Sequence, residues 1–389
     1  MILVIGWLMA ACALPSIQAA QPVTLANVMA PPPVTPDEPV AKEFSLELAA
    51  RYLDASALDW LKTRNCAACH TMTPYLMARP ATTSVLSSGA EVRRFFEDIT
   101  ATPEKAFPSS LPADGRTSVV VVTATALAFN DRMTTGKLHP LTRKALDRMW
   151  AAQRLDGGWD WPFRDVPPIK DAEHYGVTFA ALGAGLAPEE YAKTESARKG
   201  LNGIRKYLTA HAPTTLHERA MLLWVAQFVD GVLTEKERAQ TLKELLNAQR
   251  PDGGWSMASL VENPSDPTRQ TNDARQARGK DGHGAEFLVF VGRSKIYQMP
   301  LTSDGYATGF ALYVARQAGV PSADKRLQHG VAWLKSNQRV SGRWFTPSLG
   351  FHKQHLISNV GTAYAVLALQ ACGEIAPAKP VPTTDSTHR

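Results

Sequence analysis

The sequence predicts an all-α protein in which six helical hairpins close into one ring. Two observations predict this fold. A stretch ending in Gln-x-x-x-Gly-x-Trp recurs three times, and long apolar helical segments alternate with amphipathic ones along the chain. Helical repeats stack in this way because one repeat alone cannot bury its apolar face. The predicted ring occupies residues 44–373.

The outer helices of the ring are predicted from amphipathic stretches. Three of them lead into the motif: "KALDRMWAAQRLDGGW", ending at Trp159, "TLKELLNAQRPDGGW", ending at Trp255, and "HGVAWLKSNQRVSGRW", ending at Trp344. Residues 197–208 and 54–65 repeat the helical pattern without the full motif. The repeating unit is about half of the spacing between motifs, which is the length of a helix pair.

The inner helices are predicted from six segments that are apolar nearly all round, as expected of helices buried on both sides. They are residues 74–86, 118–130, 174–186, 217–228, 303–319 and 358–373. The β-branched run at 119–122 by itself favours a strand, but the repeat favours a helix there. Six inner and six outer segments close the ring without a sheet, and the first outer helix then lies against the last inner helix.

The Gln-x-x-x-Gly-x-Trp motif has a mechanical interpretation. Glycine adopts the left-handed conformation that ends many helices. The tryptophan supplies a large apolar plate, and the glutamine amide can bond terminal backbone groups. We therefore expect the motif to staple the ring and not to catalyse a reaction.

These motifs resemble the squalene-cyclase and protein-prenyltransferase repeat family, whose QW motifs match the three stretches quoted above. The resemblance covers roughly residues 45–373 and implies an α/α toroid with a central cavity. The chain departs from the family in its chemistry. The D-x-D-D acid motif of the cyclases is missing, and the Asp, Cys and His zinc set of the prenyltransferases is missing too, since no cysteine lies between Cys69 and Cys372.

Three acidic residues precede or begin inner helices and are candidate general acids. They are Asp171, Glu173 and Asp304. A strong acid needs neighbouring groups that adjust its pKa. The sequence around each of these three residues shows few such groups. Helix capping is the competing interpretation, because aspartate is a favoured N-cap residue.

The stretch "CAACH" places Cys66, Cys69 and His70 in the C-x-x-C-H spacing that attaches a c-type haem. In this interpretation the two cysteines form thioethers and His70 is the proximal iron ligand. His174 and His352 are candidate distal ligands, and an open sixth position is equally consistent. A redox-labile disulfide or a zinc site completed by histidines are the alternatives. With this motif the chain is similar to exported bacterial cyclase-like proteins that carry a haem signature.

All outer-to-inner connections of such a ring lie at one end, here called the loop rim. Seven of the ten histidines fall in or beside these connections: His70, His174, His211, His217, His283, His352 and His355. The long polar insertion at 256–303 lies at the same end. Because long loops gathered on one face usually mark the functional face, the loop rim is the expected site.

The termini predict export to the periplasm or beyond the cell. Residues 1–20 are apolar and then small, as in a signal peptide, and retention of this leader as a membrane anchor is the alternative. Residues 21–43 read as a Pro-rich linker and 374–389 as a disordered tail. A close cysteine pair and the isolated Cys372 do not make a disulfide framework.

The charge pattern and the motifs leave three functions open. The net charge is +6 and the positive residues are scattered, so a nucleic-acid partner is not expected, while a membrane surface is compatible. The first function is that of a haem c protein in electron transfer, with a redox partner protein and an apolar small molecule in the cavity. The second is an isoprenoid cyclase or transferase that uses a different acid, and the third is a glycan-binding or glycan-processing toroid.

Overall fold

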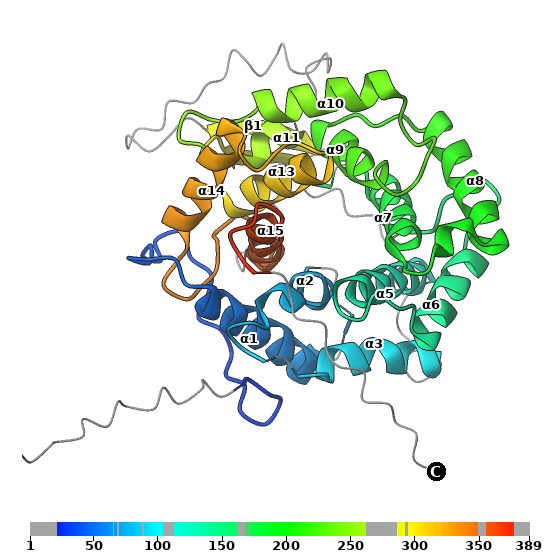
Figure 1. The fold of residues 1–389 in the computed structure, drawn as a ribbon, viewed down its shortest axis with the longest axis horizontal. Helices are drawn as coiled ribbons and strands as arrows, with labels where there is room; N and C mark the ends of the chain where they lie inside the picture. The colour runs from blue at the N-terminus through cyan, green and yellow to red at the C-terminus, as the bar shows by residue number, and fades with distance from the viewer. Residues whose placement is uncertain are drawn as a thin grey trace, which may run out of the picture.

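The chain folds as an α/α toroid, in which two concentric rings of helices share one axis (Figure 1). This computed structural model describes residues 22–64, 66–67, 70–87, 89–103, 113–161, 168–169, 171–261, 286–291, 295–348 and 355–376. The leader at 1–20 lies outside the described residues, as does the tail from residue 377 onward.

Among the described residues, six helices form the inner ring. They are α2 (Met72–Ala78), α5 (Ala113–Met133), α7 (Ala172–Leu186), α9 (Leu216–Val225), α13 (Gly305–Gln317) and α15 (Ile357–Ala371). Each packs on the next, and α15 packs on α2, so that the circle closes. The 3₁₀ helix η1 (Arg79–Thr82) continues α2. The valine run at 119–122 lies within α5, so the helix predicted there is confirmed.

In the part of the chain that the structure describes, the outer ring also contains six helices. They are α1 (Leu46–Arg64), α3 (Glu91–Ala101), α6 (Pro140–Ala151), α8 (Glu195–Ala210), α10 (Glu235–Asn247) and α14 (Lys325–Asn337). A short 3₁₀ turn, η2 (Tyr191–Lys193), precedes α8. The first outer helix, α1, packs against the last inner helix, α15, and this confirms the predicted seam of the ring.

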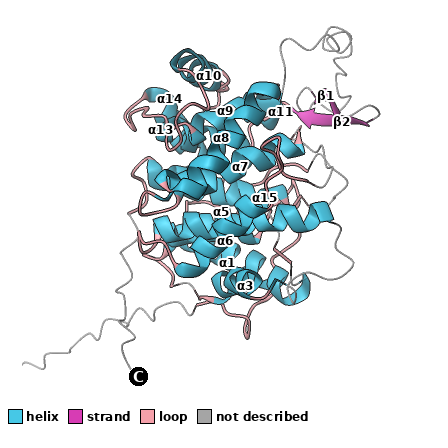
Figure 2. Ribbon diagram, turned by 90° about the vertical axis from the view of Figure 1, so that its right-hand side faces the viewer, coloured by secondary structure: helices cyan, strands magenta, loops and turns pink. Residues whose placement is uncertain are grey.

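The insertion between α10 and α13 adds a short helix and a hairpin at the loop rim. Helix α11 is Met257–Val261, and strands β1 (Glu286–Val291) and β2 (Lys295–Pro300) pair antiparallel, with Glu286 opposite Pro300 (Figure 2). The predicted ring needed no sheet, and the hairpin lies outside it. Its sequences, "EFLVFV" and "KIYQMP", are rich in β-branched and aromatic residues and are separated by only three residues, "GRS", a hairpin signal that the overall polarity of the insertion obscured.

The Gln-x-x-x-Gly-x-Trp motifs act as staples between successive outer helices. Each glutamine Nε2 donates to the glycine carbonyl of its own motif and to a carbonyl of the next outer segment. The second acceptors are Gly200 for Gln153 at 3.0 Å, Arg326 for Gln249 at 2.7 Å and Ser45 for Gln338 at 2.9 Å. Each tryptophan indole N–H bonds a carbonyl near the end of the preceding helix, at Met149, Leu245 and Leu334.

The middle of the ring is packed with aromatic rings where α9, α13 and α15 meet. Trp224 and Tyr313 lie edge to face at 5.1 Å between centroids, and Phe310 and Tyr364 lie similarly at 5.4 Å. Such pairs contribute about 0.5–1.5 kcal/mol beyond their buried area. The cavity that the family resemblance implies is thus filled by side chains at this place.

The segment at 22–43, expected as a linker, is irregular but anchored to the ring. Arg343 is completely buried, and its guanidinium bonds the carboxylate of Glu38 and the carbonyls of Pro32 and Pro33. The same guanidinium lies 5.1 Å from the ring centroid of Tyr52 on α1. The N-terminal segment therefore straps across the turn between α14 and α15.

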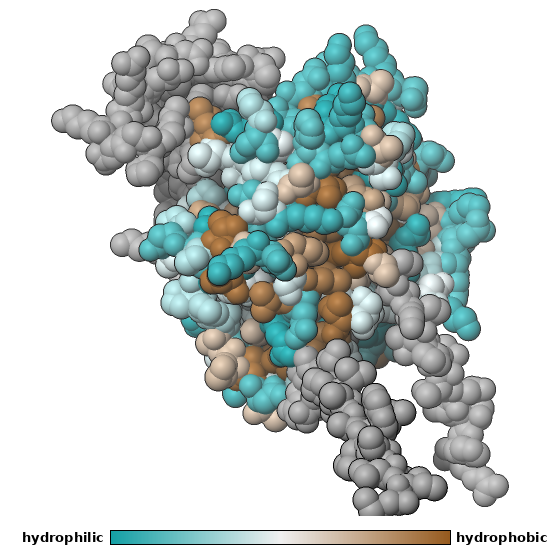
Figure 3. All heavy atoms as spheres, turned by 60° about the vertical axis from the view of Figure 1, so that its left-hand side comes forward, coloured by the Kyte–Doolittle hydropathy of each residue, from teal (hydrophilic) through white to brown (hydrophobic). Residues whose placement is uncertain are grey.

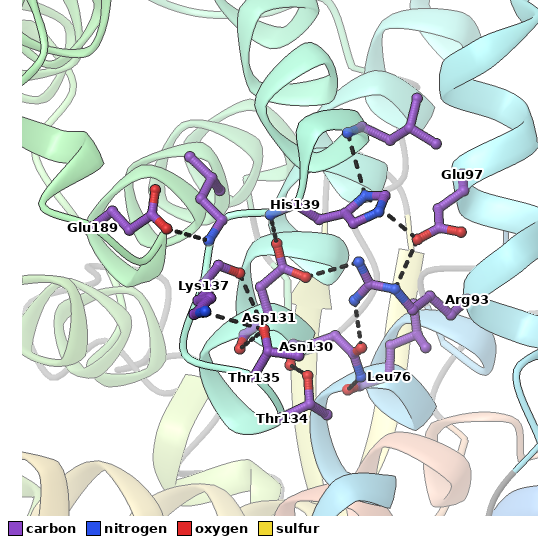
Figure 4. Close-up of polar contacts among 12 residues, drawn as sticks. Leu76, Arg93, Glu97, Asn130, Asp131, Thr134, Thr135, Lys137, His139 and Glu189 are labelled. Carbon is purple, nitrogen blue, oxygen red and sulfur yellow. Dashed lines mark hydrogen bonds and ion pairs between the residues drawn. The ribbon is translucent and has the colours of Figure 1, made fainter. Parts of the chain in front are cut away.

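The end of the ring opposite the loop rim is tied by a charged network (Figure 4). Asp131, at the end of α5, bonds the Arg93 guanidinium of α3 at 2.8 Å and the backbone N–H of His139 at 2.8 Å. Arg93 also bonds Glu97 at 2.8 Å. These partners fix the turn before α6, so His139 has a structural role.

The outer surface is mixed in polarity. Figure 3 shows one side of the molecule, on which hydrophobic and hydrophilic residues are interspersed. The large hydrophobic side chains that are most exposed are Met29, Val40, Val85, Leu155 and Val340. Within the described part of the chain, no helix combines the length and apolar character that crossing a bilayer requires.

Candidate functional site

The turn between α1 and α2 carries the C-x-x-C-H stretch at the loop rim. His70 is half-buried and lies two residues before Met72, the first residue of α2. Its ring meets the Trp60 indole of α1 edge to face, at 4.8 Å between centroids. His70 is therefore held between the last turns of α1 and the start of α2.

A buried chain of hydrogen bonds supports the His70 ring. His70 Nδ1 lies 2.6 Å from the hydroxyl oxygen of Thr71. That oxygen accepts from Asn359 Nδ2 at 3.2 Å, and the Tyr52 hydroxyl donates to Asn359 Oδ1 at 2.6 Å. Tyr52 lies on α1 and Asn359 on α15, so the chain of bonds crosses the seam at which the ring closes.

This arrangement fits a metal-ligating histidine. Ligating histidines commonly hold their second ring nitrogen in a hydrogen bond, which fixes the ring and its tautomer. Cys66 is exposed, and partial desolvation raises the pKa of its thiol. Ala68 and Cys69 lie outside the described residues. The described residues thus place Cys66 and His70 of the C-x-x-C-H stretch together on the turn between α1 and α2.

The described residues contain no cluster of three or more His, Cys, Asp or Glu side chains that could hold a metal ion. Cys66 and Cys372 are both free thiols. Cys372 follows α15 and is buried, which raises the pKa of its thiol to about 11. Cys372 is therefore a thiol of the protein core and is separate from the cysteine pair at the loop rim.

Of the two candidate distal ligands, the structure describes only His174. His352 lies outside the described residues. His174 begins α7, and its electrostatic partners are Glu218, Asp171 and His211. In the inner ring α5 lies between α7 and α2, and Glu218 of α9 is near His174, so His174 stays a prediction as a distal ligand.

Asp171 and Asp304 both cap helices. Asp171 Oδ1 accepts from the backbone N–H of His174 at 2.9 Å at the start of α7. Asp304 caps α13 through Ala307 N–H at 2.9 Å and also accepts from Met257 N–H at 2.6 Å. Burial raises the pKa of Asp304 to about 6. With both of its oxygens bonded to the protein, Asp304 ties the insertion to the ring.

Glu173 forms an ion pair. Arg154 Nη2 lies 2.8 Å from its carboxylate, and the Tyr207 hydroxyl donates to it at 3.4 Å. Arg154 belongs to the first Gln-x-x-x-Gly-x-Trp turn and also contacts Asp156 and Asp160. Glu173 therefore helps to hold this turn at the rim.

Other rim histidines also have structural contacts. His211 stacks on Tyr207 with ring centroids 4.0 Å apart. His355 Nδ1 accepts from the backbone N–H of Ser348 at 2.6 Å. His283 lies outside the described residues.

A second polar cluster lies at the starts of α7, α9 and α13, and the sequence pattern did not predict it. His217 Nε2 lies 2.7 Å from the Tyr306 hydroxyl, and both side chains are buried. The neighbouring Glu218 is buried as well. Its only sequence signal is the Thr-x-x-Glu spacing from Thr215, which predicts a capping box and gives no indication of burial.

Comparison with known proteins adds little to this picture. No protein-family model matches the chain, and no curated protein matches it. Among solved structures, one described as "Glycosidase Wild Type" is similar, with a TM-score of 0.42 and 9% sequence identity over 85% of this chain and 98% of that chain. A similarity this remote shows nothing about the function of this chain.

Proposed function

We propose that this protein is an exported α/α toroid that carries a covalent c-type haem at its loop rim and serves in electron transfer. Cys66 and Cys69 would hold the haem through thioethers, and His70 would be the proximal ligand. The bound haem would supply one-electron redox chemistry. A redox partner protein at the rim and an apolar small molecule are the partners that this role implies.

The observation that carries the proposal is the bonding of His70. Its Nδ1 is 2.6 Å from Thr71, whose oxygen is held in turn by the buried Asn359. A histidine that serves only as a surface turn residue has no need of a buried hydrogen-bond chain behind it. A proximal ligand does, because ring orientation and imidazole basicity set the properties of the bound metal.

The surroundings of His70 favour a fixed ring orientation. Met72 and Tyr75 of α2 are buried directly after it, and the Trp60 ring covers one edge. A hydrophobic shell of this kind lowers the local dielectric and influences both redox potential and solvent access. The three staples and the closed inner ring support the resemblance to the squalene-cyclase and prenyltransferase repeat.

The test is covalent haem content. The chain, with a working secretion leader, is expressed in a host with c-haem maturation machinery, and its pyridine haemochrome spectrum is recorded after denaturation. We expect a c-type spectrum from the wild type and from Cys372→Ala, and none from a Cys66→Ala, Cys69→Ala double variant. Absence of covalent haem in the folded wild type would overturn the proposal, and the isoprenoid and glycan alternatives would then be tested with polyprenyl and polysaccharide substrates.

A further inference from the structure

The first turns of α7 and α9 contain a buried polar pair that the proposed haem site does not use. His174 is 2% exposed and Glu218 is 4% exposed. Helices α7 and α9 are neighbours in the inner ring, and both begin at the loop rim. The two side chains therefore lie at one place in the fold, between two adjacent helices.

Each of these side chains has one polar atom without a hydrogen-bond partner in the described part of the chain. The atoms are Nε2 of His174 and Oε1 of Glu218. The other carboxylate oxygen of Glu218 is fully occupied, since Oε2 accepts from Thr215 N–H at 3.0 Å and from the Thr214 hydroxyl at 3.1 Å. Because buried polar atoms are nearly always bonded in native proteins, two unbonded atoms at one place indicate a bonding partner that the described residues do not supply.

Both of the unbonded atoms are acceptors. The single O–H of Thr178 donates to the carbonyl of His174 at 2.8 Å. Its oxygen, 3.5 Å from His174 Nδ1, can then only accept from that nitrogen. The proton of a neutral His174 ring is thus assigned to Nδ1, and Nε2 carries the lone pair. A ligand at this place must donate hydrogen bonds to both Nε2 and the carboxylate.

The charge of the site narrows the ligand further. None of the ion pairs formed by the described residues involves Glu218. Burial lowers the pKa of His174, and it lowers the pKa of His217 to about 3, so neither ring is charged at neutral pH. A buried carboxylate that has no cation partner among the described residues favours a positively charged ligand.

We propose that the starts of α7 and α9 form a binding site for the primary ammonium group of a small organic amine, held by Nε2 of His174 and Oε1 of Glu218. An ammonium group has three N–H donors and no acceptor, which matches two acceptors and one negative charge. His217, the residue before Glu218, stacks on Phe310 with ring centroids 4.8 Å apart, so the pair lies next to aromatic side chains. Aromatic neighbours favour a cation with a short hydrocarbon chain. The proposed amine site uses none of Cys66, Cys69 and His70, so it does not depend on the proposed haem.

The test is calorimetric titration of the full chain with n-butylammonium, with n-butanol as the neutral counterpart. We expect saturable binding of n-butylammonium, and binding of n-butanol weaker by about tenfold or more, since charged hydrogen bonds are the stronger kind. Glu218→Gln should weaken n-butylammonium binding by about the same factor. Glu237→Gln is the matched control, because Glu237 occupies the same capping-box position at the exposed start of α10.

Several results would overturn the proposal. They are no saturable binding by the wild type, equal binding of the alcohol and the ammonium ion, or unchanged binding by Glu218→Gln. If Glu218→Gln does not fold, the ¹⁵N resonance of His174 Nε2 in the wild type decides. It should move on titration with n-butylammonium and stay in place with n-butanol, and a resonance that moves with neither contradicts the proposal.

Discussion

Individual buried residues make the stability of this protein depend on pH in opposite directions. Burial lowers the pKa of His217 to about 3 and raises the pKa of Asp304 to about 6. His217 contributes stability that is complete above pH 6.5 and is lost as the pH falls toward 3. Asp304 contributes stability that is present below pH 3.8 and is lost as the pH rises to about 6.

The contribution of His217 can be isolated by substitution. Between pH 6.5 and about 3, the free energy of unfolding should fall by about 1.4 kcal/mol for each pH unit of acidification. We expect His217→Gln to lose this dependence while keeping a polar partner for Tyr306. Urea unfolding of both proteins from pH 6.5 downward measures it, with Asp304→Asn as the background that removes the opposing contribution. Parallel pH curves for His217→Gln and wild type would show that His217 is not held neutral.

Thr71 is predicted to tune the haem through His70. Its oxygen bonds His70 Nδ1 at 2.6 Å, and such a bond raises the basicity of a ligating imidazole. Thr71→Val should leave covalent haem in place and raise the reduction potential, because a less basic imidazole stabilises ferric iron less well. Thr63→Val, at an exposed hydroxyl near the end of α1, is the control. Equal potentials in the two variants would show that Thr71 serves only the fold.

At the scale of elements, the staple glycine Gly342 is required by two separate constraints. It has a φ of +94°, and a Cβ there would lie 2.1 Å from the Leu48 carbonyl oxygen of α1. Gly319, which follows α13 and lies outside the staples, has a φ of +89° with open space around it. The two positions therefore separate backbone strain from close approach of the neighbouring helix.

Alanine substitutions at these two glycines should differ in cost. Gly319→Ala should lower the free energy of unfolding by about 1–2 kcal/mol, from the left-handed backbone alone. Gly342→Ala should lose a further ~1–3 kcal/mol, because α1 must shift to admit the methyl group. Urea unfolding of the two variants compares them. Equal losses would contradict the close packing of the staple on α1.

The staples also show what could be predicted from sequence. The period of the motif, the apolar inner segments and the closing seam were all predictable, because they rest on local patterns repeated along the chain. The hydrogen bond from each glutamine amide to the next outer segment was not predictable, because it depends on how the helices pack in space. The same limit applies to Glu218, whose capping box is a local pattern but whose burial beside His174 is set by the packing of α7 on α9.

At the scale of the whole molecule, closure depends on a strap as well as on helix packing. The segment at 22–43 reads as a linker because proline dominates its composition, yet its Glu38 is held by the buried Arg343. The composition of a segment does not show that one of its residues, here Glu38, has an ion-pair partner far away in the sequence. The strap, residues 22–43, binds the turn between α14 and α15 through Arg343, and Arg343 also contacts Tyr52 of α1 near the seam.

Breaking the strap should destabilise the ring as a whole. Glu38→Gln leaves a buried guanidinium without its counter-ion, and we expect a loss of about 3–5 kcal/mol in the free energy of unfolding. Glu47→Gln, which breaks the exposed pair between Glu47 and Arg51, should cost about 0–1 kcal/mol. Thermal and urea unfolding of both variants compare the two pairs. A loss for Glu38→Gln as small as that of the control would mean that the strap does not contribute to closure.

Covalent haem attachment is tested most directly by peptide mapping of the protein, expressed with a secretion leader, after tryptic digestion. The peptide of residues 65–93 contains Cys66, Cys69 and His70. We predict that this peptide carries the added mass of one haem, absorbs as a c-type haem, and loses both properties in the double cysteine variant. Recovery of the peptide with two free thiols, or with a disulfide between them, from a host that matures c-type haem would contradict covalent haem attachment.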